Sequence, residues 1–252
     1  AFQNPRALSL LLAFVVLAVY LPTLSHPFVF DDIPDLVSNP DVLRFRDCLD
    51  TVSRSQNTGL SGRPVACLTF AANVASGGFS VRGFHIVNIV IHVFTALTLF
   101  GIVRRTIEHV PGPQSGGSSA YCAAVIAALW ALHPLQTESV TYIIQRIESL
   151  AGLFYLLTLY CAIRAVPGVS LIWPVLSVLS CVLGMLTKEI VATAPLVVYL
   201  YDQVFVRKLH AWRPKPLHVA LAITWVIPAY LISQSPRGGS AGFGLGVTAL
   251  DY

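Results

Sequence analysis

Charged residues are scarce in this chain of 252 residues, in which Asp, Glu, Lys and Arg together account for 11%. Soluble globular domains carry about 25% charged residues. Hydrophobic residues account for 55%, and the mean hydropathy is +0.71. A soluble fold of this size could not bury so much apolar surface, so the composition predicts a polytopic membrane protein. The net charge of +4 then gives no reason to expect a nucleic-acid partner.

Cysteine pairs with the CxxC spacing of zinc or redox sites are absent, although the chain has five cysteines. Cys122, Cys161 and Cys181 fall in apolar runs, where no partner is evident. Cys48 and Cys67 fall in a polar region. A disulfide between these two is one interpretation of their placement.

The long hydrophobic runs predict membrane-spanning helices. At 1.5 Å per residue, the run 7–24 nearly crosses a hydrocarbon core of about 30 Å. No small-x-small cleavage site follows it, so we interpret it as a retained span and not as a signal peptide. We therefore expect an all-α bundle of about seven transmembrane helices in a single domain, 1–252. The six further runs are 84–103, 121–132, 147–163, 171–187, 190–206 and 217–232.

Eight basic residues fall on one side of these alternating spans, which predicts that this side is cytoplasmic; the long outer loop is exempt from this rule. Ten of the twelve acidic residues fall on the other side. Carboxylate chemistry is therefore expected to face the periplasm, the exterior or a lumen. The basic residues are Arg6, Arg104, Arg105, Arg164, Arg207, Lys208, Arg213 and Lys215.

A long polar segment, 25–83, is the expected first outer loop. Within it, Arg63-Pro64 opens a mixed apolar run, 65–75. Pro64 suits the first position of a helix, and the composition favours a helix lying at the membrane interface.

The adjacent acids Asp31 and Asp32 follow the first span and are flanked by Phe28 and Phe30. Adjacent acids in a loop are usually solvated or cap a turn, but partial desolvation at a membrane surface would raise their pKa values and favour catalysis. If the segment is locally extended, the two side chains point to opposite faces. One could then act on a substrate while its neighbour anchors an arginine, a metal or the backbone.

The stretch 138–149 predicts an amphipathic helix at the outer end of the fourth span, with Arg146 at the border of its polar face. Its polar face either meets water at the interface or forms a cavity wall where Arg146 binds an anion. The polar face consists of Glu138, Thr141, Tyr142, Gln145, Glu148 and Ser149.

One face of the second span carries His85, Asn88, His92 and Thr95, and we expect it to point inward because polar groups facing lipid are costly. The two histidines are about 10.5 Å apart along the axis, too far to bind one metal ion together. Interhelical hydrogen bonding is the expected role. His85, nearest the outer surface, is the better candidate for substrate contact.

Two short motifs, His133-Pro134 and Lys188-Glu189, can be interpreted as a helix stop and a loop ion pair. Both nevertheless fall on the outer side with Asp31-Asp32, Arg63 and Arg146. Four separate loops are thus expected to bring charges to one surface.

With these residues noted, the chain resembles the transmembrane and tetratricopeptide-repeat O-mannosyltransferases, a family of the GT-C superfamily that also holds the protein O-mannosyltransferases. The matching motifs occur in the family's order over most of the chain, and the Gln145-Arg146 version is closer to bacterial relatives than to animal ones. The motifs are Phe30-Asp31-Asp32; Arg63-Pro64 with Leu68-Thr69-Phe70; Gly83-Phe84-His85 with Val87-Asn88 and His92; His133-Pro134 with Thr137-Glu138-Ser139-Val140; Gln145-Arg146 with Glu148-Ser149-Leu150; and Lys188-Glu189.

The resemblance implies a GT-C-like bundle that moves a sugar, typically mannose, from a polyprenyl-phosphate carrier to Ser/Thr hydroxyls of an acceptor protein on the non-cytoplasmic face. It also implies that the acidic pair supplies the base, with Asp31 the first choice and Asp32 its support. A lipid phosphate leaves as a stable anion, so one base can suffice if positive charge meets the phosphate, and in-line attack would invert the anomeric centre. The substrate-binding candidates are Arg63, His85, His133, Glu138, Arg146, Glu148, Lys188 and Glu189.

The same resemblance favours a multi-pass protein of a bacterial inner membrane, or of the endoplasmic reticulum in a eukaryote. A divalent metal at Asp31-Asp32 is left open, because some GT-C enzymes use one and others do not. The chain contains no tetratricopeptide repeat, begins without Met and ends at Tyr252, so we expect the N-terminal membrane part of a longer protein, incomplete at its C-terminus. A non-enzymatic membrane anchor or assembly platform is the alternative. A transporter is disfavoured, because no paired acids cross the membrane.

Overall fold

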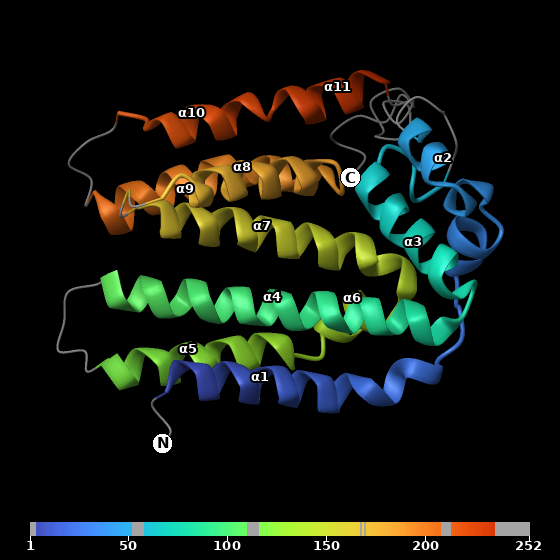
Figure 1. Cartoon of the computed structure of the whole chain (residues 1–252), viewed down its shortest axis with the longest axis horizontal. Helices are drawn as coiled ribbons and strands as arrows, with labels where there is room; N and C mark the ends of the chain where they lie inside the picture. The colour runs from blue at the N-terminus through green and yellow to red at the C-terminus, as the bar shows by residue number, and fades with distance from the viewer. Residues whose placement is uncertain are drawn as a thin grey trace, which may run out of the picture.

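The protein folds into helices that run side by side (Figure 1). Its structure, a computed structural model, describes residues 4–51, 58–109, 116–166, 168, 170–207 and 213–234. These described residues contain no strand, so the expected all-α class is confirmed. The α-helices are α1 Pro5–Tyr20, α2 Phe45–Asp50, α3 Pro64–Gly77, α4 Val81–His109, α5 Gly116–Ala131, α6 Gln136–Thr141, α7 Arg146–Ala165, α8 Ile172–Met185, α9 Ala194–Tyr201, α10 Pro216–Ile223 and α11 Val226–Gln234. The 3-10 and π-helical segments are η1 Leu21–Ser25, η2 Ile33–Val37, η3 Pro40–Leu43, η4 Ile143–Gln145, η5 Glu189–Thr193 and η6 Asp202–Val206.

Four continuous helical stretches of the described chain are long and apolar enough to cross a membrane, and they match the predicted first, second, fourth and sixth spans. The predicted third, fifth and seventh spans form apolar helices shorter than the ~20 residues a straight crossing needs. The polytopic membrane architecture is thereby confirmed. The four long stretches are Pro5–Ser25, Val81–His109, Ile143–Ala165 and Glu189–Val206.

The bundle is built around α4, which packs against α1 and α5 on one side and against α7 on the other; α8 packs next to α7 (Figure 1). On α5 the buried positions Ala120, Ala123 and Ala127 belong to one core cluster with apolar residues of α1 and α4. Small residues at such an interface let helix backbones approach closely, which supports packing without a hydrophobic driving force in lipid.

The predicted outer loop folds over one end of the bundle, to the right in Figure 1, as η2, η3, α2 and α3. Pro64 is the first residue of α3, so the expected helix over 65–75 is confirmed. A disulfide joins Cys48 on α2 to Cys67 on α3, with 5.4 Å between their Cα atoms. The basic residues predicted to be cytoplasmic lie towards the opposite end of the bundle as far as the structure describes them, and Lys208 lies outside the described residues.

One local prediction about the outer end is wrong, and one condition considered for the acidic pair is not met. The stretch 138–149 is not one amphipathic helix, because α6 ends and the backbone becomes extended at Tyr142 (φ −83°, ψ 113°) before η4 and α7. The Asp31-Asp32 segment is not extended either, since Asp32 has helical dihedral angles (φ −56°, ψ −32°) at the start of η2. The two stretches meet in hydrogen bonds from the Asp31 N–H to Tyr142 and from the Ile144 N–H to Asp32.

Candidate active site at the outer-loop end

Asp32 is buried, with 1% of its surface exposed, and its carboxylate binds the outer loop to η4, which directly precedes α7. Oδ2 accepts a hydrogen bond from the Val29 N–H at 3.0 Å, and Oδ1 accepts one from the Ile144 N–H at 2.8 Å. Burial raises the pKa of this carboxyl group, while the two backbone N–H groups and the nearby His85 oppose the shift. Asp32 therefore anchors the backbone, one of the three roles considered for the second acid.

Asp31, one residue earlier, is exposed. Its backbone N–H donates to the Tyr142 hydroxyl oxygen at 2.9 Å. The preceding residue, Phe30, has a φ of 45° and packs edge-on against the Tyr142 ring. This turn sends Asp31 to the surface and Asp32 inward, so the expected division of the pair is present although the segment is not extended.

The Tyr142 phenol therefore lies directly beside the candidate base. Burial raises its pKa, and the Asp31 and Asp32 carboxylates add to the increase. A neutral phenol accepts from the Asp31 N–H and keeps its own O–H as a donor. Tyr142 thus fixes the backbone of Asp31 without adding charge to the site.

His85 lies beneath this turn and is fully buried. Its Nε2 lies 3.1 Å from the carbonyl oxygen of His26, and its Nδ1 has no hydrogen-bond partner among the described atoms. The structure thus places His85 close to Asp32 but closed off from the surface.

Asn88 and His92, further along α4, bind backbone carbonyl groups where neighbouring helices end. Asn88 Nδ2 donates to the carbonyl oxygen of Val140 in α6 at 3.2 Å, and His92 Nε2 lies 2.9 Å from that of Ala131 in α5. Carbonyl groups at helix ends have no partner within their own helix. The inward orientation and the interhelical hydrogen bonding expected for this face are confirmed.

Arg146 is the largest fully buried side chain of the described chain and lies under the site, not on its surface. Its guanidinium carbon lies 4.3 Å from the centroid of the Phe70 ring and 5.5 Å from that of Phe84. Nε donates to Asn88 Oδ1 at 2.7 Å, Nη1 to the Thr69 carbonyl and Nη2 to the Phe84 carbonyl. This geometry joins α3, α4 and α7 and does not present Arg146 to an anion.

A second cluster gathers four of the predicted residues from three segments of the chain. Arg63 precedes α3, and its Nη2 lies 3.8 Å from Oε2 of Glu189 in η5. Lys188 forms an ion pair with Glu148 in α7. Lys188 and Glu189 therefore bind other segments, in contrast to the interpretation as a loop ion pair. Burial lowers the pKa of Lys188, and the neighbouring Arg63 lowers it further.

A cavity of about 200 Å³ lies on the bundle side of this ion-pair cluster. Glu148 is one wall, so the cavity adjoins the Lys188–Glu148 pair, and the Ser149 hydroxyl donates to the Ser139 carbonyl within it. Most of the residues that line this cavity are of polar types. The lining residues are His92, Thr95, Trp130, Gln136, Ser139, Glu148, Ser149 and Gly152.

The chain is similar to several known proteins whose names share the words protein O-mannosyl-transferase. The chain is 33% identical over 207 residues to protein O-mannosyl-transferase Tmtc2 of Drosophila melanogaster, 32% over 198 residues to protein O-mannosyl-transferase F38B6.6 of Caenorhabditis elegans, and 30% over 200 residues to protein O-mannosyl-transferase TMTC4 of Mus musculus. These alignments cover 76%, 75% and 71% of this chain. Over this region, the chain belongs to the family of these protein O-mannosyl-transferases.

The chain spans about a quarter of the length of these curated relatives, since the alignments cover 21%, 28% and 27% of them. No protein-family model matches the chain. No solved structure matches it either. The similarity to the three named relatives confirms the family membership that the short motifs indicated.

Two of the residues that the family resemblance suggested, His133 and Glu138, are exposed between α5 and the end of α6. His133 Nδ1 accepts a hydrogen bond from the Leu135 N–H at 3.2 Å, as a helix stop would. The structure brings neither side chain into contact with Asp31 or with the ion-pair cluster of Arg63, Glu148, Lys188 and Glu189.

Other features of the candidate site were not evident from the sequence. Tyr142 was assigned only to a polar helix face, and Trp130 and Gln136 were not singled out at all. Only the fold shows their roles, because each meets residues from distant segments. Within the part of the chain that the structure describes, no group of three or more His, Cys, Asp or Glu residues is arranged to hold a metal ion.

Proposed function

We propose that this chain forms the catalytic outer face of a membrane glycosyltransferase that moves mannose from a polyprenyl-phosphate carrier to Ser/Thr hydroxyls of proteins. The observation that carries the proposal is the division of the acidic pair: Asp31 is exposed, while Asp32 binds the same turn to Ile144 in η4. A base must be accessible and held in place, and this pair meets both needs. The names of the relatives support the reaction class.

The proposed reaction uses Asp31 as its base. The Asp31 carboxylate takes the proton of the acceptor hydroxyl while the hydroxyl oxygen forms a bond to the anomeric carbon. The bond between that carbon and the phosphate oxygen breaks, and the electron pair leaves with the lipid phosphate. Attack opposite the leaving group inverts the anomeric centre. Unlike hydrolysis of an ordinary glycoside, no acid has to protonate the leaving oxygen.

Positive charge for the phosphate would come from Lys188 and Arg63, whose side chains are 26% and 17% exposed. In this proposal the phosphate replaces Glu148 and Glu189 as the partner of these cations. Charge-assisted hydrogen bonds to a leaving phosphate strengthen as its charge develops. Arg146 instead acts as a positioning residue, because its donors already bind the protein. His133 and Glu138 remain candidates for binding the acceptor protein.

The disulfide between Cys48 and Cys67 supports a location of this face outside the cytoplasm. Disulfides persist in oxidising compartments such as the bacterial periplasm and the lumen of the endoplasmic reticulum. The basic residues at the other end of the bundle agree with this orientation, because cytoplasmic loops are enriched in Lys and Arg.

The test is transfer of labelled mannose from polyprenyl-phosphate mannose to protein, in membranes that contain the full-length protein. Asp31→Asn should abolish transfer while expression and unfolding temperature stay equal to wild type. Glu108→Gln is the matched control, because Glu108 is a half-exposed acid at the opposite end of the bundle. The control should transfer at the wild-type rate.

Three results would contradict parts of this proposal. Equal labelling by Asp31→Asn and wild type would remove Asp31 from the mechanism. Loss of labelling in both Asp31→Asn and Glu108→Gln would show a general defect instead of a lost base. Wild-type membranes that fail with mannose and with other polyprenyl-linked sugars would favour the membrane anchor or assembly platform.

A further inference from the structure

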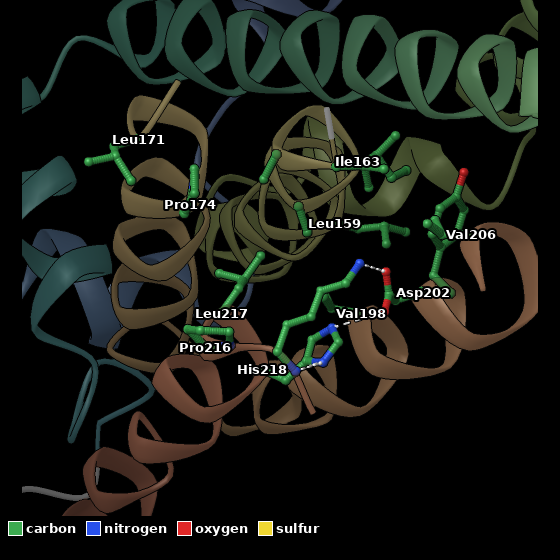
Figure 2. A pocket seen from close by; sticks show the side chains of 15 residues that line it. Leu159, Ile163, Leu171, Pro174, Val198, Asp202, Val206, Pro216, Leu217 and His218 are labelled. Atoms are coloured by element: carbon green, nitrogen blue, oxygen red, sulfur yellow. Dashed lines mark hydrogen bonds and ion pairs between the residues drawn. The ribbon is translucent and has the colours of Figure 1, made fainter. Parts of the chain in front are cut away.

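A pocket of about 340 Å³ opens at the basic end of the bundle, between α7, α8, the junction of α9 with η6, and α10 (Figure 2). Ligand-binding pockets in proteins are typically ~300–1,000 Å³. Leu171 and Pro174 lie on one side of the view, while Asp202 and His218 lie on the other, facing each other. The pocket thus combines an apolar wall with a charged rim.

The apolar wall continues away from the rim. A second hollow of about 490 Å³ shares Pro174, Pro216 and Leu217 with the first and follows the groove between α8 and α10 as far as Val182. Residues 174 and 182 are about 12 Å apart along a helix axis. The combined groove runs parallel to the membrane-spanning helices, which is the direction of a lipid chain in a bilayer.

The charged rim is centred on Asp202, which is 5% exposed. Its carboxylate lies 2.6 Å from Lys215 Nζ, 2.7 Å from Arg207 Nε and 3.8 Å from His218 Nε2. His218 Nδ1 accepts a hydrogen bond from the Lys215 N–H, so in the neutral ring the proton is on Nε2, facing Asp202. Two permanent cations against one carboxylate leave the rim positive even when His218 is neutral.

Further donors to an anion are present at this rim. An ammonium group has three N–H donors, of which Asp202 receives one, and the Lys215 side chain is 39% exposed. Arg213 is exposed two residues before Lys215 in the chain. The mouth of the groove therefore attracts an anion.

The geometry points to a binding site for an anionic glycerophospholipid of the leaflet at the basic end. Its phosphate would bind at Lys215 and Arg213, and one acyl chain would lie in the groove between α8 and α10. Basic pockets between membrane helices recognise anionic headgroups in this way. The site lies at the opposite end of the helices from Asp31, so it is distinct from the site of sugar transfer.

The first test measures the unfolding temperature of the full-length protein in detergent micelles, with added dioleoyl phosphatidylglycerol or phosphatidylcholine. A ligand that binds only the folded state raises this temperature as its concentration increases. Phosphatidylglycerol should give the larger increase. Inorganic phosphate and a polyprenyl phosphate are the two further probes, and each should give a smaller increase than phosphatidylglycerol.

Two variants separate the headgroup from the chain. Lys215→Gln should weaken the apparent affinity for phosphatidylglycerol about fivefold, the usual effect of one basic residue near an anionic lipid. Leu217→Trp keeps every charge and should reduce binding by filling the groove, so it tests the proposal even if Lys215→Gln does not fold. Arg6→Gln is the matched control, because Arg6 is an exposed basic residue on α1 at the same end, and it should bind like wild type.

Several results would overturn the inference. Equal stabilisation by phosphatidylglycerol and phosphatidylcholine would exclude headgroup recognition. A phosphatidylglycerol preference that survives in Leu217→Trp would place the lipid elsewhere or leave the groove to another helix of the protein. Equal stabilisation by inorganic phosphate would mean an anion site without a chain, and stronger stabilisation by polyprenyl phosphate would mean a different lipid class.

Discussion

The two ends of the bundle each contain a prominent carboxylate, and the two are held in opposite ways. Asp202, at the basic end, is buried with Arg207, Lys215 and His218 within 3.8 Å. Asp31, at the outer-loop end, is exposed, and no ion pair to it is present among the described residues. A carboxylate surrounded by cations is a weak base that holds structure together, whereas an accessible one without a cation partner can take a proton from a substrate.

The outer end of the bundle also contains interrupted helices. At the outer end α6 breaks from α7 at Tyr142, and α5 ends at Ala131, so backbone groups are released within the bundle. Side chains of the spans and of the outer loop bind these groups: Asn88 and His92 bind carbonyls, and Asp32 binds an N–H. Unsatisfied backbone groups are costly inside a membrane, so irregular backbone there needs such partners. The buried polar residues thus support the turn that exposes Asp31.

The largest effect expected from this comparison is on stability at the basic end. Asp202→Asn should lower the free energy of unfolding by about 3–4 kcal/mol, because it leaves the largely buried Arg207 and the partly solvated Lys215 without their anion. Transfer per folded molecule should stay near wild type. Asp31→Asn should abolish transfer and change the free energy of unfolding by no more than about 0.5 kcal/mol. Denaturant unfolding and the labelling assay on the same preparations measure both, and lost transfer in fully folded Asp202→Asn would break the comparison.

The second effect sharpens what holds the outer end. Replacing Cys48 and Cys67 together by Ala should lower the free energy of unfolding by about 3 kcal/mol, as expected for a disulfide that closes a loop of this length. A reductant should lower the stability of wild type but not of the double variant. Cys122→Ala, which removes an exposed free thiol, is the matched control. Equal responses of wild type and double variant to the reductant would argue against the disulfide.

The third effect concerns pH at the outer end. Burial raises the pKa of Asp32 above that of the unfolded chain, so protonation favours the folded state and acidification through this pKa does not lower the free energy of unfolding. Protonation of Asp32 does weaken its hydrogen bonds from the Val29 and Ile144 N–H groups. Transfer should therefore begin to fall at a pH above the pKa of a free Asp, which is about 3.9. The pH profile of kcat/KM, compared with unfolding at the same pH values, measures this.

Asp32→Asn is the variant for this third effect. Its amide oxygen can accept one of the two N–H groups, and the other faces an NH2 group, so a loss of about 1–3 kcal/mol in stability is expected. Reduced transfer should accompany it. Full wild-type transfer by Asp32→Asn across the pH range would show that the anchor does not position Asp31.

The spans were predictable because each depends on a continuous run of apolar residues, such as 84–103 within α4. The inward face of α4 was predictable for a similar reason, since its polar residues recur at helical spacing. The disulfide was only one interpretation, because pairing depends on how the loop folds back. The spans and the inward face of α4 differ from the site, because residues close together in the sequence determine them.

The site itself depends on contacts between distant segments. The hydrogen bonds from Asp31 to Tyr142 and from Ile144 to Asp32 join residues more than 100 positions apart. Neither the positive φ of Phe30 nor the helix break at Tyr142 follows from local residue types. Arg146 illustrates the same limit: a continuous helix would place it at the border of a polar face, whereas in the structure it is buried against the rings of Phe70 and Phe84.

The smallest effect tests the finest part of the comparison, the phenol beside Asp31. Tyr142→Phe removes the acceptor of the Asp31 N–H but keeps the ring against Phe30. A net hydrogen bond contributes about 0.5–1.5 kcal/mol, so transfer should fall roughly twofold to tenfold. Tyr121→Phe, which removes an exposed phenol from α5, is the matched control and should not change transfer. Unchanged transfer in Tyr142→Phe would show that the turn holds Asp31 without the phenol. A loss as complete as that of Asp31→Asn would instead mean that the phenol contacts the reacting groups, because a positioning hydrogen bond alone cannot account for so large an effect.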